Sequence, residues 1–224
     1  MAEIIFISEK NRERYLRIIT PIGNLLARIG VHPHVLTITG LILSIVAGFL
    51  YSSGSFFWAA CVVIFAGTCD SLDGQIARQT QKNSPFGSFF DSALDRYSDM
   101  FLFMGLAYHY AGGKALPLYN GTDIDCPTSP WAVFFVIMAM TGSFMVSYTR
   151  ARAEGIGVEC KAGLMQRPER IVLLIIGSLL GPIPKIGPIL LKATIIILAV
   201  SSNLTAIHRI FYVRNKISKE DRVR

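Results

Sequence analysis

The sequence predicts an all-α integral membrane protein, in which six transmembrane helices follow an interfacial N-terminal helix and enclose a polar cavity open to the cytoplasm. Three observations lead to this fold class. Of the 224 residues 52% are hydrophobic and 17% are charged, with a mean hydropathy of +0.47, too apolar for an ordinary soluble domain. The apolar residues form runs such as 35–51, 56–69 and 131–146, which approach the roughly 20 residues that cross a bilayer as a helix. The basic residues lie at the edges of these runs.

The first 33 residues are expected to form a helix that lies on the membrane surface. Over about 8–30, apolar residues alternate with arginines at roughly helical spacing; the apolar residues are Leu16, Ile19, Leu25, Leu26 and Ile29, and the arginines are Arg12, Arg17 and Arg28. A helix with an apolar face and a basic face is typical of the boundary between headgroups and acyl chains. The segment 1–33 is therefore interpreted as an interfacial helix.

The transmembrane domain is expected to occupy residues 34–212, and glycine, proline, serine and asparagine separate its apolar runs. The six spans are expected at about 34–52, 56–78, 89–111, 131–152, 169–182 and 186–211. The fifth has a short apolar core, 171–180, so its start at 167–170 is expected to continue as helix into a polar cavity. Residues 213–224 are expected to form a basic cytoplasmic tail.

The distribution of lysine and arginine predicts the orientation in the membrane. With six spans, all but three of the 22 basic residues fall on the side of the N-terminus, the exceptions being Lys114, Lys185 and Lys192. Because basic residues favour the cytoplasmic side, both termini are expected there, in a cell membrane, with the loop 112–130 outside. The net charge of +7 is thus explained by orientation and anionic lipid, and no nucleic-acid partner is expected.

Acidic residues cluster where the second and third spans approach the cytoplasm. Five aspartates lie within 30 residues: Asp70, Asp73, Asp91, Asp95 and Asp99. Carboxylates at membrane depth are costly unless they have a partner. Spacings of three and four residues put the first pair and the next pair each on one helix face, and two antiparallel helices would bring these faces together. Such a four-carboxylate cage suits Mg²⁺ or Mn²⁺. The alternative is that the aspartates cap helices or pair with Arg78 and Arg96.

The order of these residues resembles the signature of the CDP-alcohol phosphotransferase family. It reads Asp70-x-x-Asp73-Gly74-x-x-Ala77-Arg78, eight residues, Gly87, three residues, Asp91, three residues and Asp95. The resemblance implies a homodimer with two metal ions per active site, held by Asp70, Asp73, Asp91 and Asp95. It also implies that Asp95 is the catalytic base and that Asp73, Gly74, Ala77, Arg78 and Gly87 bind the CDP moiety. One departure is His34, where many members have asparagine.

A second group of residues points to the alcohol that accepts the transferred group. The strings Ser147-Tyr148-Thr149-Arg150-Ala151-Arg152-Ala153-Glu154 and Gln166-Arg167-Pro168-Glu169-Arg170 are similar to those of the phosphatidylinositol phosphate synthase branch. The resemblance implies transfer from a CDP-activated lipid, such as CDP-diacylglycerol, to inositol 1-phosphate, giving phosphatidylinositol phosphate and CMP. Ser147, Arg150, Arg170 and Arg209 are expected to hold the acceptor's phosphate. The alternative is a basic loop that binds anionic headgroups.

Other functions remain open at the level of the sequence. Within the family, the alternatives are phosphatidylglycerophosphate synthase, phosphatidylserine synthase and a CDP-inositol-dependent di-inositol phosphate synthase. A cation transporter would need polar residues through the whole bilayer, whereas these acids are confined to one side. A scaffold without activity gives no reason for an unbroken signature.

Overall fold

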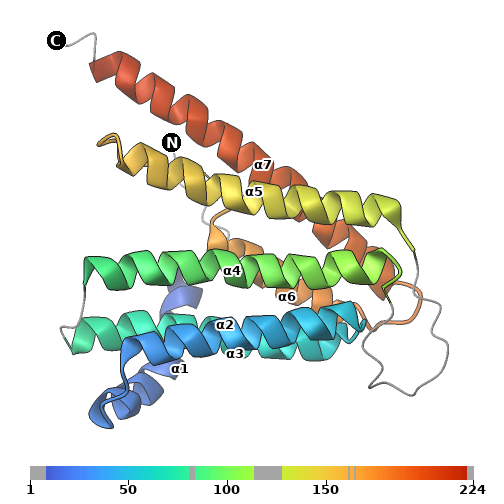
Figure 1. Cartoon of the computed structure of the whole chain (residues 1–224), viewed down its shortest axis with the longest axis horizontal. Coiled ribbons are helices and arrows are strands. Elements are labelled where there is room, and N and C mark those ends of the chain that lie inside the picture. The colour runs from blue at the N-terminus through green and yellow to red at the C-terminus, as the bar shows by residue number, and fades with distance from the viewer. Residues whose placement is uncertain (1–8, 81–83, 114–127, 161, 164, 221–224) are drawn as a thin grey trace.

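The computed structural model describes residues 9–220 except 81–83, 114–127, 161 and 164. Within this part, all regular structure is helical, and there are seven helices (Figure 1). Their bounds are α1 Glu9–Arg28, α2 Pro33–Ser52, α3 Phe56–Gln79, α4 Pro85–Tyr110, α5 Pro130–Glu154, α6 Arg167–Leu180 and α7 Gly187–Glu220. The predicted all-α fold class is confirmed.

Helices α2, α4, α5 and α6 each have a proline in the first two positions, because its fixed φ suits the first turn, where its missing N–H is not needed. These prolines are Pro33, Pro85, Pro130 and Pro168. The start of α4 is also capped, since Ser84 Oγ accepts a 2.9 Å hydrogen bond from the Gly87 backbone N–H. This cap explains why α4 starts at Pro85, four residues before the expected start of the third span.

The helices pack as an antiparallel bundle (Figure 1). Helix α2 packs on α3 and α4, α5 packs on α7, and α6 contacts both α3 and α7. The α2–α4 crossing is close because Gly48 and Gly105 face each other; a Cβ added to Gly105 would overlap the Gly48 carbonyl. One apolar core runs through α2 to α7, including Tyr51, Leu106 and Leu198. The ends of α3, α5 and α7 therefore lie on the same side as the starts of α4 and α6.

Helix α1 lies against α3 and carries two apolar faces. On one face Ile19 is buried against Leu72 and Ile76. Tyr15 Oη also donates a 3.0 Å hydrogen bond to Thr68 Oγ1. The other face exposes an apolar stripe at helical spacing, formed by Ile18, Ile22, Leu25 and Ile29. An exposed stripe of this kind is what a helix resting on lipid requires.

Among the described residues, four helices are long and apolar enough to cross a membrane: α2, α3, α5 and residues Gly187–Ser218 of α7. The other two expected spans differ in composition or length. Helix α4 carries four charged residues, Asp91, Asp95, Arg96 and Asp99, and α6 has only 14 residues. Helix α7 continues to Glu220, past the expected end at 211, because Val213 and Ile217 pack against Val158 and Cys160.

Candidate metal and substrate site

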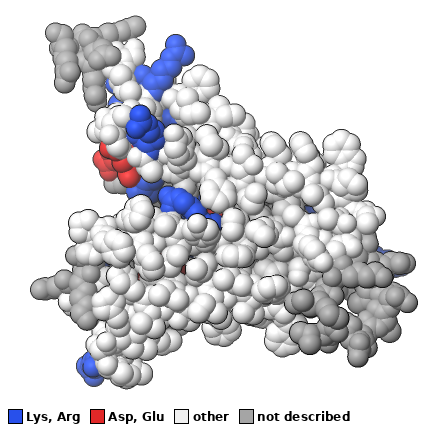
Figure 2. All heavy atoms as spheres, viewed as in Figure 1, with Lys and Arg blue, Asp and Glu red and all other residues white. Residues whose placement is uncertain are grey.

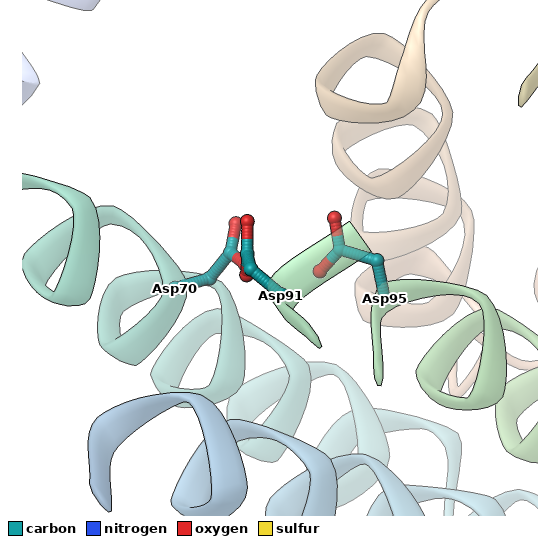
Figure 3. A group of neighbouring side chains, drawn as sticks. All are labelled: Asp70, Asp91 and Asp95. Carbon is teal, nitrogen blue, oxygen red and sulfur yellow. The ribbon is translucent and has the colours of Figure 1, made fainter. Parts of the chain in front are cut away.

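Three carboxylates from α3 and α4 converge at the middle of the site. Asp70 of α3 and Asp91 and Asp95 of α4 each offer one oxygen, and these oxygens lie within 4.8 Å of one another. Figure 3 shows Asp70 and Asp91 side by side, with Asp95 one helical turn away. The three residues lie inside their helices, so they do not cap helix ends. The predicted meeting of acidic faces on antiparallel helices is observed for these three residues.

Asp73 lies one turn after Asp70 but belongs to a different local environment. Its side chain is buried, and Thr37 Oγ1 of α2 donates a 2.7 Å hydrogen bond to its Oδ2. Asp73 is not part of the three-oxygen group. Of the expected cage of four carboxylates, three therefore converge and the fourth is held beside them by α2.

The three-carboxylate group fits a divalent cation. Asp91 Oδ1 is buried and has no hydrogen-bond partner among the described residues, an arrangement that is costly unless something else satisfies the oxygen. Negatively charged oxygens from three side chains are the ligands that Mg²⁺ and Mn²⁺ prefer. The donor set that the chain supplies thus matches a hard metal ion.

Arg167, at the first position of α6, contacts the same group. Its Nη1 donates a 3.0 Å hydrogen bond to Asp70 Oδ2 and lies 2.8 Å from Asp95 Oδ1. Arg167 belongs to the basic string 166–170, but no role was predicted for it. The feature of the sequence that could have indicated a role is its place at the start of a short helix in a basic string. The structure shows that this residue contacts α3 and α4 through Asp70 and Asp95.

A second ion pair lies deeper in the bundle, one turn beyond Asp95. Asp99 Oδ2 accepts hydrogen bonds from Ser143 Oγ at 2.6 Å and from Arg170 Nη2 at 3.4 Å. The side chain of Arg170 is only 3% exposed and that of Asp99 only 7%. Asp70, Asp95 and Asp99 therefore pair with Arg167 and Arg170, whereas Arg96 donates to the Ser92 carbonyl of its own helix.

The arginines predicted to hold the acceptor are divided between the interior and the surface. Arg209 of α7 is buried; its Nε donates a 2.7 Å hydrogen bond to the Ala162 carbonyl, and its Nη1 donates to the Val146 carbonyl. Arg170 and Arg150 both lie within electrostatic range of Arg209. Arg150 is exposed and pairs with Glu154 at 2.9 Å, and Ser147 is half-buried one turn before it.

The residues expected to bind the CDP moiety lie around the end of α3 and the start of α4. Gly74 and Arg78 line a cavity between α1, α2, α3, α4 and α6. A Cβ added to Gly74 would lie 3.5 Å from Arg78 Nη1. Gly87 lies beside Ser84 and His34, and the His34 ring packs edge-on against Phe90. Ala77 is half-buried on α3 and is not among the residues that line the cavity.

The cavity has a volume of about 780 Å³ and lies between α1, α2, α3, α4 and α6. One part of its wall is charged and includes Asp70, Asp95, Asp99 and Arg167. Another part is apolar and is formed by α3, α4 and α6, through Val63, Ile64, Leu102, Ile171, Val172, Ile175 and Ile176. In Figure 2, the lysine and arginine atoms on the visible face gather mainly at the end of the bundle where α3 and α5 end and α4 begins. The cavity thus joins a charged region to an apolar one.

Known proteins are similar to this chain in sequence and in fold. The sequence pattern of the CDP-alcohol phosphatidyltransferase family matches residues 30–208. An archaetidylinositol phosphate synthase of Methanothermobacter thermautotrophicus is 36% identical over 201 residues, covering 90% of this chain and 91% of that protein. A phosphatidylinositol phosphate synthase of Streptomyces avermitilis is 34% identical over 217 residues, covering 94% of this chain and 83% of that protein.

Solved structures agree with the sequence comparison. The phosphatidylinositol phosphate synthase of Mycobacterium tuberculosis with CDP-DAG bound superimposes with a TM-score of 0.74 at 32% identity, over 88% of this chain and 94% of that chain. The same enzyme in complex with manganese and citrate gives a TM-score of 0.73, over 87% and 88%. The resemblance predicted from the aspartate motif is confirmed: this chain is a transferase that belongs to the CDP-alcohol phosphatidyltransferase family.

Proposed function

We propose that this protein transfers the phosphatidyl group, or its archaeal equivalent, from a CDP-activated lipid to inositol 1-phosphate, producing phosphatidylinositol phosphate and CMP in phospholipid biosynthesis. The observation that carries the proposal is the cavity whose charged wall continues into an apolar wall. A donor with a diphosphate at one end and acyl chains at the other needs both surfaces. The names of the relatives support this donor and this acceptor.

We assign the metal ions to the aspartates of the signature. Asp70, Asp73, Asp91 and Asp95 would hold two Mg²⁺ ions, or Mn²⁺, and the relative with bound manganese supports a divalent metal. When bound, such ions stabilise negative charge on the oxygens of a phosphoryl group in transfer. Asp73, Gly74, Ala77, Arg78 and Gly87 would hold the CDP moiety, with the small residues leaving room for it.

The reaction requires one proton transfer and one exchange of P–O bonds. The acceptor hydroxyl oxygen attacks the lipid-side phosphorus, the bond from that phosphorus to CMP breaks, and CMP leaves with the electron pair. Asp95, at the edge of the carboxylate group, accepts the proton of the hydroxyl. Ser147, Arg150, Arg170 and Arg209 orient the acceptor through its phosphate, since guanidinium groups bind phosphate by paired hydrogen bonds.

In the proposed membrane arrangement, α2 to α7 are the six spans and α1 lies on the cytoplasmic surface. Both termini and the cavity would then face the cytoplasm. The short α6 and the charged α4 would be accommodated because Asp95 and Asp99 of α4 and Arg167 of α6 line the cavity rather than face lipid. A homodimer is proposed from the resemblance to the family.

The test of the proposed function is release of CMP by purified protein in lipid nanodiscs with CDP-diacylglycerol and Mg²⁺. The acceptors compared are inositol 1-phosphate, free inositol, glycerol 3-phosphate and serine, each with the wild type, Arg150→Ala and Arg152→Ala. We expect inositol 1-phosphate to be preferred. Arg150→Ala should weaken its apparent affinity by roughly 1.5–3 kcal/mol, the value of a charged hydrogen bond. Arg152→Ala, an exposed arginine of the same helical turn, is the matched control.

Two outcomes would count against the proposal. Equal turnover of free inositol and inositol 1-phosphate, unaffected by Arg150→Ala, would remove the phosphate-binding role. A clear preference for glycerol 3-phosphate would leave the phosphate-binding role of the arginines in place, because the arginines alone suit either phosphorylated acceptor. It would, however, assign the protein to phosphatidylglycerophosphate synthesis.

A further inference from the structure

The ion pair between Asp99 and Arg170 lies outside the aspartate signature, and the mechanism above gives Asp99 no role. Both side chains are almost completely buried. Taking both charges out of water is costly, and a hydrophobic pair of similar volume would often stabilise a fold as well or better. In a membrane protein, buried charges of this kind are found mainly where the function needs them.

The contacts of Asp99 divide between its two oxygens. Oδ2 accepts hydrogen bonds from Ser143 of α5 and Arg170 of α6, and Arg170 Nη1 also donates to the Met165 carbonyl at 3.3 Å. These contacts fix one edge of the Arg170 guanidinium and engage only some of its N–H groups. Asp99 thus sets the direction in which the rest of this side chain points.

The second oxygen of Asp99 faces the other arginine of α6. Oδ1 lies 3.7 Å from Arg167 Nε, and neither atom has a hydrogen-bond partner in the described part of the chain. Arg167 is meanwhile held by Asp70 and Asp95, the carboxylates that cations would compete for. When a cation displaces the Arg167 guanidinium from Asp70 and Asp95, a small movement would let Arg167 Nε donate a hydrogen bond to Asp99 Oδ1.

We propose that Asp99 is a positioning residue that aims Arg170 and Arg167 at the phosphate of the acceptor, so that the preference for a phosphorylated alcohol depends on it. This inference rests on the proposed function of the same site. The positioning role and simple charge neutralisation predict opposite changes in the KM for the acceptor. A carboxylate that only neutralised the arginines would weaken phosphate binding, and its removal would lower the KM for the acceptor. A carboxylate that orients them strengthens binding, and its removal raises the KM.

The experiment compares the wild type, Asp99→Asn, Asp99→Glu and Ser178→Ala in nanodiscs with CDP-diacylglycerol and Mg²⁺. It measures KM and kcat for inositol 1-phosphate, the affinity for CDP by calorimetry, and the Tm. Ser178→Ala is the matched control, because it removes a buried hydrogen bond of 2.8 Å, with Tyr51, near the other end of α6. We expect Asp99→Asn to raise the KM at least tenfold with CDP affinity changed less than twofold. Asp99→Glu should recover part of the loss, and Ser178→Ala should lower only the Tm.

Each contrary result has a distinct meaning. A KM for Asp99→Asn that is unchanged or lower, with the wild type preferring the phosphorylated acceptor, overturns the positioning role and leaves the proposed function intact. A wild type without that preference overturns both. If Asp99→Asn cannot be purified folded, Asp99→Glu decides: a KM raised several-fold supports the role, and a KM equal to that of the wild type overturns it.

Discussion

The hydroxyl of Thr37 in α2 donates a 2.7 Å hydrogen bond to Asp73 Oδ2 in α3, and both side chains are buried. Of the four signature carboxylates, Asp73 is therefore oriented by a neighbouring helix. Thr37→Val removes the hydrogen bond at nearly constant volume. We expect it to weaken the combined binding of CDP and Mg²⁺ by about 1 kcal/mol or more, roughly fivefold, measured by calorimetry. The control is Thr39→Val, whose hydroxyl donates to the Val35 carbonyl of its own helix; equal losses in the two variants would show that the contact with Asp73 is unimportant.

Asp95 and Asp70 should have separable roles although their oxygens are close. Asp95→Asn is expected to abolish CMP release while CDP binding remains largely intact, because it removes the proposed base but keeps the shape of the side chain. Asp70→Ala is expected to lose metal and CDP binding together. Turnover assays at saturating acceptor test the loss of activity, and calorimetry with CDP and Mg²⁺ tests which variant still binds. Near wild-type turnover of Asp95→Asn would rule out its assignment as the base.

Arg167 should stabilise the metal-free protein and compete with metal. In Arg167→Met, three carboxylates would face one another without the guanidinium, so the free energy of unfolding in EDTA should fall by about 1–3 kcal/mol. The affinity for Mn²⁺ without substrate should rise several-fold, because a competing cation is removed. The Tm in EDTA and a Mn²⁺ titration measure these effects. Arg152→Met controls for the loss of an exposed charge, and unchanged Tm and affinity in Arg167→Met would contradict the competition.

The proposed topology can be tested with single cysteines in a variant that lacks the four native ones. Ile156→Cys lies after α5, on the side assigned to the cytoplasm, and Ser53→Cys lies at the α2–α3 turn on the opposite side. In inside-out vesicles, an impermeant maleimide should label position 156 but not position 53. Asn120→Cys, which lies outside the described residues, is expected to behave like position 53. Labelling of position 120 from the cytoplasmic side alone would contradict six spans.

The spacing of the aspartates predicted much of the site because helical periodicity is a local property. Asp70 on one helix and Asp91 and Asp95 on the next were expected to meet, and their oxygens do lie together. The contact between Arg167 and this group could not be predicted in the same way. It depends on how the connection after α5 returns the chain so that α6 begins above α3 and α4, which no periodicity encodes.

The boundaries of the helices were less predictable than their existence. Residues 213–220 appear in the sequence as a basic tail, yet Val213 and Ile217, four residues apart, pack against Val158 and extend α7. The relevant signal was two apolar residues among charged ones, which hydropathy averaging hides. Asp99 was noted with the other acids, but its partners Ser143 and Arg170 come from two different helices and required the tertiary structure.

The shortness of α6 has a consequence for how two substrates of opposite solubility meet. A helix of 14 residues is roughly 21 Å long, whereas the hydrocarbon layer is roughly 30 Å thick. In the proposed orientation, water can therefore descend to the level where Arg167 meets the carboxylates. Exposing each buried methylene of an acyl chain to water costs about 0.8 kcal/mol. In that orientation the protein would avoid the cost, because the water-soluble acceptor would reach the reacting phosphate while the acyl chains stay in the bilayer.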